Sequence, residues 1–269
     1  AGQFSSSTKM SGKAAFITGY VDDDADTDTD NLTMEYMYQL NLNTSFTGED
    51  NLYTRIKTGN VGDHFADKGQ GTYLGAASSS TAYDDDGDAY QSGNLKVDKL
   101  WYQFPVGDSL QVWVGPRIEN YYMLASAPSI YKPITKQFAL GGNASAYGSS
   151  TSPGFGVAWT EQAEDPMDGR FAISMNYTSK DGANSAKGLN DDTARSFLLT
   201  KVEYGSPRWQ VSAAMAKKSS PAGTVNGYDG YFHTAEAKAT GGDLTAYGLR
   251  AYWKPETTGG IPEVQVGYD

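Results

Sequence analysis

Alternation of apolar and polar residues runs through most of this sequence. In residues 31–43 the apolar or aromatic side chains of one parity are Leu32, Met34, Tyr36, Tyr38, Leu40 and Leu42. Successive side chains of a β-strand leave opposite faces, so this pattern predicts a strand with one apolar and one polar face. The same pattern predicts eleven strands, at residues 9–20, 31–45, 51–58, 95–104, 109–116, 154–160, 169–178, 196–204, 208–216, 244–253 and 263–268.

Short and long connections between these strands alternate along the chain. The short ones carry Gly, Pro and Asp at turn positions and are residues 47–50, 105–108, 162–168, 205–207 and 254–262. The long ones are residues 21–30, 59–94, 117–153, 179–195 and 217–243. In an antiparallel up-and-down sheet, this order places every long loop at one end. Outer-membrane β-barrels have that layout, although a simple soluble meander could share it.

The less polar face of the clear strands carries no charged residue. A Lys or Arg facing lipid at the bilayer midplane costs roughly 2–4 kcal/mol, so a bilayer would impose this absence, and a dry protein core would impose it too. Aromatic residues on this face lie beside most short turns, at Phe104, Trp159, Phe171, Tyr204, Trp209 and Trp253. Such rings are typical of a girdle at a membrane–water interface. They favour a membrane barrel over a soluble β core.

Composition excludes several other classes of protein. The sequence has no run of 18 apolar residues and therefore predicts no membrane-spanning helix. The absence of Cys removes disulfides, thiolate metal sites and thiol nucleophiles. A net charge of -11 argues against a nucleic-acid partner. His64 and His233 lack metal-ligand spacing and no nucleotide or hydrolase motif is present, so we expect neither enzyme activity nor a cofactor.

Two acidic stretches, at residues 22–30 and 84–88, invite comparison with calcium-binding loops. Neither has the Gly and Glu that an EF-hand loop requires. We interpret both as solvated loop tips and predict no metal site.

Three stretches resemble the barrel of cyanobacterial outer-membrane porins: residues 4–21, 38–60 and 95–122. The most specific part is KLWYQFPVGDSLQVWVGP, at residues 99–116. These porins, often with an SLH domain and often described as iron-uptake porins, are related to the OprB carbohydrate-selective porin superfamily. The resemblance implies a trimeric passive channel in the outer membrane of a cyanobacterium, with its outer face in contact with the membrane lipid. The solutes would be small and hydrophilic, such as sugars, inorganic ions or iron.

The chain departs from that family in two ways. Family members usually carry an N-terminal SLH domain, which binds the cell-wall polymer, and a helical segment, and neither precedes Ala1. The chain stops within a strand at residues 264–269, and the predicted strand count is odd, whereas bacterial single-chain barrels have even counts. We therefore expect residues 1–269 to be one partial β-barrel porin domain, with its closing strands missing. A genuinely open sheet, with an unsatisfied edge in lipid, is the alternative.

With the apolar face outward, the opposite face carries the candidate pore-lining residues. They are Glu35, Arg55, Lys57, Lys99, Arg170, Lys201, Glu203, Arg208, Arg250 and Glu263. Seven of the ten are basic, and a basic wall in a narrow lumen would favour anions. The alternative is that these charges pair with one another and stiffen the wall.

The long connection at residues 117–153 is the candidate constriction loop, because porins commonly fold one long loop into the barrel. Its aromatic and aliphatic content suits packing against an inner wall. Its charges nearest the constriction would be Arg117, Glu119, Lys132 and Lys136. The equally long connection at residues 59–94 is the alternative. If the protein is not a channel, the second hypothesis is a soluble or surface-attached β protein that binds glycans or other partners through its long loops.

Overall fold

The computed structural model describes residues 7–20, 32–60, 95–131, 140–148, 151–219, 243–257 and 259–269. Eleven strands form one sheet in the order of the sequence, from β1 to β11, and every neighbouring pair is antiparallel. The strands are β1 (Thr8–Gly19), β2 (Thr33–Thr44), β3 (Asn51–Gly59), β4 (Lys96–Val106), β5 (Leu110–Ile118), β6 (Ser152–Thr160), β7 (Arg170–Ser179), β8 (Ser196–Ser206), β9 (Trp209–Ser219), β10 (Leu244–Trp253) and β11 (Val264–Tyr268).

The predicted all-β, antiparallel up-and-down fold is confirmed, and each predicted strand is present with ends that differ by a few residues. The only helical elements in the described part of the chain are η1 (Asn120–Tyr122) and α2 (Ala144–Tyr147). No helix among the described residues is long and apolar enough to cross a membrane. β1 and β11 each pair with a single neighbour within the described sheet, so the sheet is not closed into a barrel.

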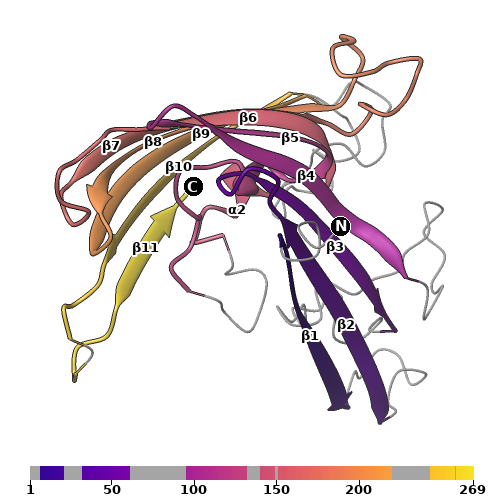
Figure 1. Ribbon diagram of the computed structural model, residues 1–269, viewed down its shortest axis with the longest axis horizontal. Coiled ribbons are helices and arrows are strands. Elements are labelled where there is room, and N and C mark those ends of the chain that lie inside the picture. Colours follow the sequence, from indigo (N-terminus) through magenta and orange to yellow (C-terminus); the bar gives the residue numbers. More distant parts are fainter. Residues whose placement is uncertain are drawn as a thin grey trace.

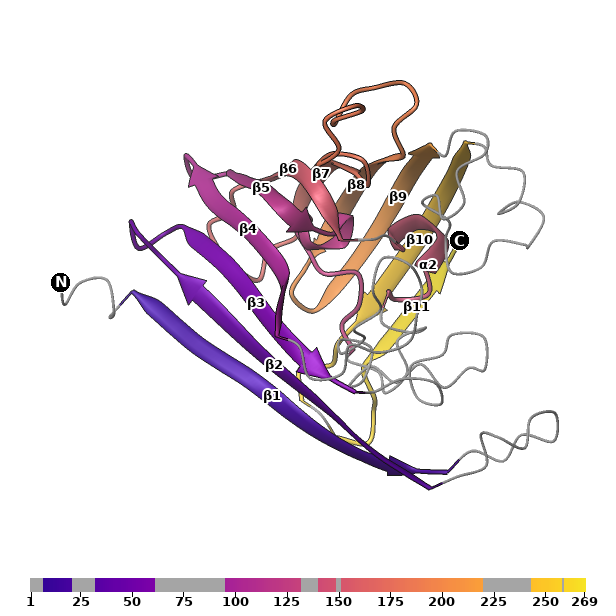
Figure 2. The same ribbon diagram turned by 90° about the vertical axis from the view of Figure 1, so that its right-hand side faces the viewer.

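The sheet bends into an arch, and part of the β5–β6 connection lies beneath it. Figure 1 shows α2 under the arch formed by β4 to β10, and Figure 2 shows the same arrangement from the side. We call residues 119–131 and 140–148 of this connection the inner segment. It packs on the concave face of the sheet, where α2 contacts β9 and β10 and η1 contacts β7 and β8.

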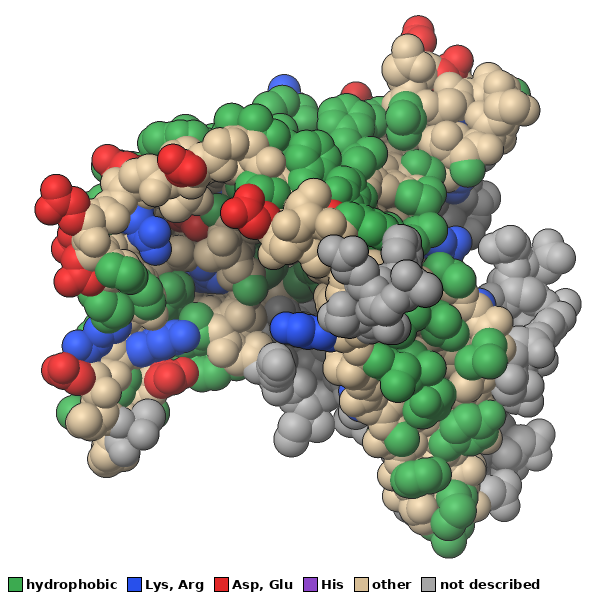
Figure 3. All heavy atoms as spheres, in the orientation of Figure 1, with side chains coloured by type: hydrophobic (Ala, Val, Ile, Leu, Met, Phe, Trp, Pro, Cys, Tyr) green, Lys and Arg blue, Asp and Glu red, His purple; other side chains and the backbone are tan. Residues whose placement is uncertain are grey.

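The two faces of the sheet differ in polarity as the alternation predicts. On β7, Phe171, Ile173 and Met175 are 46–52% exposed on the convex face. Their neighbours Ala172 and Ser174 are 4% and 1% exposed under the inner segment. Figure 3 shows hydrophobic side chains spread over the outer side of the arch. The apolar side chains are therefore not buried between two stacked sheets, which a soluble sandwich would require.

The short turn at residues 45–50 shows how a single side chain fixes a connection. Asp50 Oδ1 accepts hydrogen bonds from the N–H groups of Phe46 and Thr47, at 2.9 and 2.8 Å, and from the Ser45 hydroxyl at 2.8 Å. Its Oδ2 accepts from the Tyr102 hydroxyl on β4 at 2.6 Å. Burial raises the pKa of Asp50, but these hydrogen bonds outweigh burial and hold that pKa far below its usual range.

Candidate functional site

The candidate site is the concave face of the sheet together with the inner segment that covers it. Asn120, at the start of η1, is fully buried and joins the segment to two strands. Its Nδ2 donates to Asn176 Oδ1 on β7 at 2.6 Å and to the Phe197 carbonyl on β8 at 3.2 Å. The Thr178 hydroxyl donates to Asn120 Oδ1 at 2.7 Å. Every polar group of the Asn120 side chain is thus satisfied, as a buried amide requires.

Apolar packing holds the later part of the inner segment against β8, β9 and β10. Leu124, Leu140 and Tyr147 of the segment share one core with residues of those strands. The strand residues are Phe197, Leu199, Ala214, Ala216 and Ala246. Small alanine side chains on β9 and β10 leave the space that α2 occupies, so the segment can approach the sheet closely.

Three cations on consecutive strands donate to main-chain carbonyl oxygens of the inner segment. Lys201 Nζ on β8 lies 3.1 Å from the Ser126 carbonyl, and Arg250 Nη1 on β10 donates to the carbonyl of Ala127. Lys218 Nζ on β9 lies 2.7 Å from two carbonyl oxygens, that of residue 145 within α2 and that of residue 148 directly after it. We call Lys201, Lys218 and Arg250 the cation clamp.

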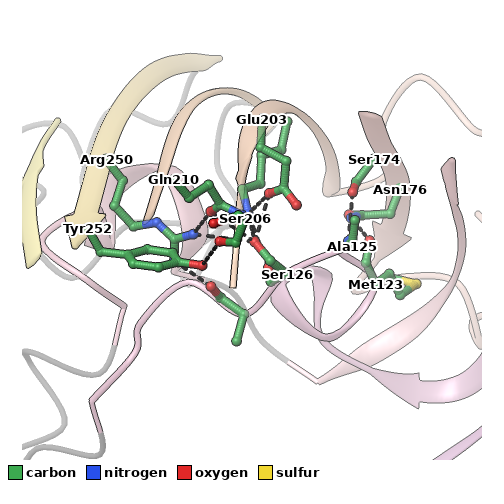
Figure 4. Close-up of polar contacts among 12 residues, drawn as sticks. Met123, Ala125, Ser126, Ser174, Asn176, Glu203, Ser206, Gln210, Arg250 and Tyr252 are labelled. Carbon is green, nitrogen blue, oxygen red and sulfur yellow. Dashed lines mark hydrogen bonds and ion pairs between the residues drawn. The ribbon is translucent and has the colours of Figure 1, made fainter. Parts of the chain in front are cut away.

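The side chains around the clamp complete a buried polar network, part of which is drawn in Figure 4. Lys201 forms an ion pair with Glu203, and Arg250 donates to Gln210 Oε1. The Ser126 hydroxyl lies 2.8 Å from Glu203 Oε2. Lys201, Glu203 and Arg250, which the sequence assigned to the pore wall, do lie on the concave face, but they are 0–5% exposed and contact the inner segment.

A second charged network lies on β3 and β4, where a β-bulge makes Asp98 the extra residue between Lys99 and Val97. Asp98 accepts from Arg55 Nε at 2.5 Å and lies 3.0 Å from Lys57 Nζ. Lys99 Nζ lies 3.0 Å from Glu119 Oε2 at the start of the inner segment. These predicted pore-lining cations are therefore paired with carboxylates.

Aromatic rings connect this second network to the inner segment. Tyr53 stacks on Trp101 with ring centroids 4.2 Å apart, and Trp101 lies 4.9 Å from Tyr122. Tyr121 continues the row at 4.6 Å from Tyr122. Arg55 Nη1 lies 3.4 Å from the Tyr122 hydroxyl. Aromatic contacts and ion pairs thus fix the first residues of the segment against β3 and β4.

The remaining predicted site residues lie in different surroundings. Glu35 is buried on β2, and the Glu263 carbonyl, next to β11, accepts a hydrogen bond from the Tyr131 hydroxyl. Arg208, in the β8–β9 turn, lies 3.4 Å from Glu256 in an exposed ion pair. Arg170 is partly exposed on the concave side of β7, and its side chain has no hydrogen-bond or ion-pair partner among the described residues.

The predicted constriction-loop charges divide in the same way. Glu119 belongs to the inner segment, as described. Arg117 is exposed, opposite Leu100 across the β4–β5 pair, and its Nε lies 3.3 Å from the Asp98 carbonyl. Lys132 and Lys136 lie outside the described residues, as do both histidines, both acidic stretches and nearly all of the alternative loop at residues 59–94. No group of His, Asp or Glu that could hold a metal ion occurs in the described part of the chain.

Contacts with the last residues of the chain hold the far end of the inner segment. Asn143 Nδ2 donates to the carbonyl oxygens of Leu249 and Tyr268, at 3.1 and 2.7 Å. The Ile130 N–H donates to Gln265 Oε1 at 2.9 Å. Sequence reasoning missed Asn143 because it belongs to no motif of recognised spacing, and it missed Lys218 because the predicted strand ended at residue 216, before β9 does.

Comparison with known proteins places this architecture in a family. Residues 1–262 match the carbohydrate-selective porins of the OprB family. The chain belongs to this family. The resemblance to OprB-related porins that the sequence indicated is therefore confirmed.

Individual relatives of this OprB-family chain are distant. An uncharacterised protein of the cyanobacterium Nostoc sp. is 33% identical over 125 residues, a stretch that covers 45% of this chain and 21% of that protein. The chain therefore spans only about a fifth of that relative's length. Among solved structures, two mutants of the Rh. blastica porin are 12% and 11% identical, with TM-scores of 0.44 and 0.40. Each comparison covers 97% of this chain and 93% of the porin.

Proposed function

We propose that this chain forms the wall of an outer-membrane porin, a passive diffusion channel for small hydrophilic solutes and inorganic ions. The observation that carries the proposal is the contrast between the two faces of one sheet. The convex face exposes apolar side chains on strand after strand, whereas the concave face carries polar networks and the inner segment. Lipid in contact with the convex face accounts for its apolar side chains, and water on the concave side accounts for the polar networks.

Aromatic residues beside the short turns support a membrane boundary at that end of the strands. Trp159, Trp209 and Trp253 are 38–46% exposed on the convex face. Phe171 and Tyr204 lie 4.4 Å apart between ring centroids, and Tyr204 lies 5.5 Å from Trp209. Trp and Tyr have an apolar body and a polar tip, which suits the interface between lipid and water.

The inner segment would set the width of the channel. It lies on the concave face and is fixed at both ends, so it reduces the cross-section open to solutes. Transport by diffusion past this constriction needs no catalytic residue, cofactor or covalent step. The solutes that the family description suggests are carbohydrates. We also propose, from the resemblance to cyanobacterial porins, that the chain assembles as a homotrimer and comes from a cyanobacterium. Contact with the cell-wall polymer would be made through an SLH domain.

A closed channel also needs hydrogen-bond partners for the outer edges of β1 and β11, since lipid offers none. We propose that residues 1–269 are one porin domain and that further strands complete its wall. The proposal is tested by reconstituting the full-length chain in planar bilayers, where stepwise conductance is expected. The channel proposal also predicts that the purified chain is monodisperse only in detergent and that its electrophoretic mobility in SDS changes on boiling.

A chain that is monodisperse without detergent and produces no conductance steps would refute the channel. That outcome would favour the second hypothesis, a soluble or surface-attached protein that binds glycans through its long loops. Binding of oligosaccharides by the detergent-free chain would then be the next measurement.

A further inference from the structure

The far end of the inner segment meets β10 and β11 at two glycines of the concave face, Gly248 on β10 and Gly267 on β11. A Cβ atom added to Gly267 would overlap the main-chain carbonyl oxygen of Gly141 in the inner segment. A Cβ atom added to Gly248 would lie 3.1 Å from Asn143 Cγ and 3.2 Å from Ala146 Cβ. The absence of a side chain at both positions therefore lets the segment lie directly on the two strands.

The inner segment also meets β11 through glycines. Gly141 and Gly142 have φ angles of +69° and +83°, in the left-handed region that favours glycine. A Cβ atom on Gly142 would lie 3.1 Å from Gly267 Cα. A Cβ atom on Gly141 would overlap the carbonyl oxygen of Pro128 within the same segment. Main chain thus contacts main chain at this point, with no side chain between the segment and β11.

The hydrogen bonds of this end depend on that close approach. Asn143 Nδ2 reaches the main-chain carbonyl oxygens of Leu249 on β10 and Tyr268 on β11, at 3.1 and 2.7 Å. The Ser145 N–H donates to Asp269 Oδ2 at 2.6 Å. An N–H···O hydrogen bond weakens when its atoms lie more than about 3.2 Å apart. Even a small displacement of the segment away from the strands would therefore break these contacts.

We infer that Gly248 and Gly267 are positioning residues, which set how deeply the inner segment sits on the concave face and thereby how wide the channel is. The inference rests on the proposed channel function. Non-bonded heavy atoms pack about 3.5–4.0 Å apart, so a methyl group at Gly267 would displace the segment by about 1 Å or more. The methyl group lies between the sheet and the segment, so the displacement is directed into the lumen and narrows it. At Gly248 the crowding is milder, and the displacement would be a few tenths of an ångström.

The test measures the single-channel conductance of the full-length chain in planar bilayers, together with the largest polyethylene glycol that still enters the channel. Gly267→Ala should lower the conductance and exclude polymers that enter the wild type. Gly248→Ala should act in the same direction by a smaller amount. Gly260→Ala, in the β10–β11 connection, is the matched control, because a Cβ atom there meets no described atom within 4 Å. This variant should keep both wild-type values.

A stability measurement separates positioning from a merely structural role. The temperature at which heating changes the mobility in SDS reports how firmly each variant is folded. A lower transition temperature with unchanged conductance in both Gly267→Ala and Gly248→Ala would overturn the inference. A larger conductance in Gly267→Ala would also overturn it, because the segment would then be detached rather than displaced. If Gly267→Ala does not fold, the conductance of Gly248→Ala decides. Absence of conductance in the wild type would instead refute the channel itself.

Discussion

Lys218 should control how firmly the α2 end of the inner segment is held on the sheet. Its Nζ donates at 2.7 Å to two main-chain carbonyl oxygens, of Ser145 within α2 and of Gly148 directly after it. The same Nζ lies 4.7 Å from the centroid of the Phe197 ring. Hydrogen bonds to a charged group contribute about 1.5–3 kcal/mol each, so the two together contribute about 3 kcal/mol or more.

Replacing Lys218 by Met removes these bonds and also removes the cost of burying a charge, because Lys218 is only 2% exposed. The net loss should then be about 2 kcal/mol, which raises the population of the detached α2 on the order of 30-fold. Hydrogen exchange reports this population directly. The amides of Tyr147 and Gly148, which donate to Asn143 and Ala144 within α2, should lose protection by the same factor.

Single-channel recordings should show the functional consequence. In Lys218→Met we expect frequent excursions to a larger conductance, because the detached end no longer narrows the lumen. Lys217→Met is the control: Lys217 is the preceding residue of β9, exposed on the convex face. Lys218→Arg should restore most of the protection. Equal exchange rates and equal conductance in Lys218→Met and Lys217→Met would show that the clamp does not hold the segment.

Three further predictions concern other parts of the molecule. The Arg170 side chain has no partner among the described residues, so its charge can act on ions in the lumen. Arg170→Gln should therefore shift the reversal potential in a salt gradient toward lower anion preference, and Arg170→Lys should keep the wild-type reversal potential. Val157→Lys, at the convex centre of β6, should cost roughly 2–4 kcal/mol and reduce folding into lipid vesicles, whereas Val157→Leu should fold normally. Hydrogen bonds from Arg195 lower the pKa of Asp181 from 3.8 to about 2. The Asp181–Arg195 pair should protect the amides of the β7–β8 connection from hydrogen exchange fully above pH 4, and this protection should be lost as the pH falls to about 2. In Asp181→Asn, the protection of these amides should no longer change over that pH range.

Alternation predicted the strands well because burial acts on every second residue of a strand. In the stretch FAISM at residues 171–175, the alternation predicts one face for residues 171, 173 and 175 and the other for residues 172 and 174. In the structure the first set is exposed on the convex face and the second is buried on the concave face. Strand ends were less predictable, and Lys218 shows the consequence. Residues 217–243 read as one polar loop, yet β9 continues to Ser219. The parity of Ala214 and Ala216 would have placed Lys218 on the concave face.

The partners of the charged residues could not be predicted from the pattern. Asp98 and Lys99 are adjacent, so strict alternation places them on opposite faces, but the bulge allows Asp98 to reach Lys57 on the concave side. Asn120 lies in no periodic segment, and its partners on β7 and β8 are more than 50 residues away in sequence. Such contacts depend on how a connection folds back on the sheet, which local sequence does not encode.

The ion pairs of both charged networks reduce the field in the channel. Lys99 and Lys201 each pair with a carboxylate, Glu119 and Glu203, so each pair is close to neutral at a distance. A field that favours anions must then come from concave-face cations without a carboxylate partner among the described residues, such as Arg170 on β7. The reversal potential of Arg170→Gln therefore separates the two interpretations of the basic wall, because pairing alone would leave it unchanged.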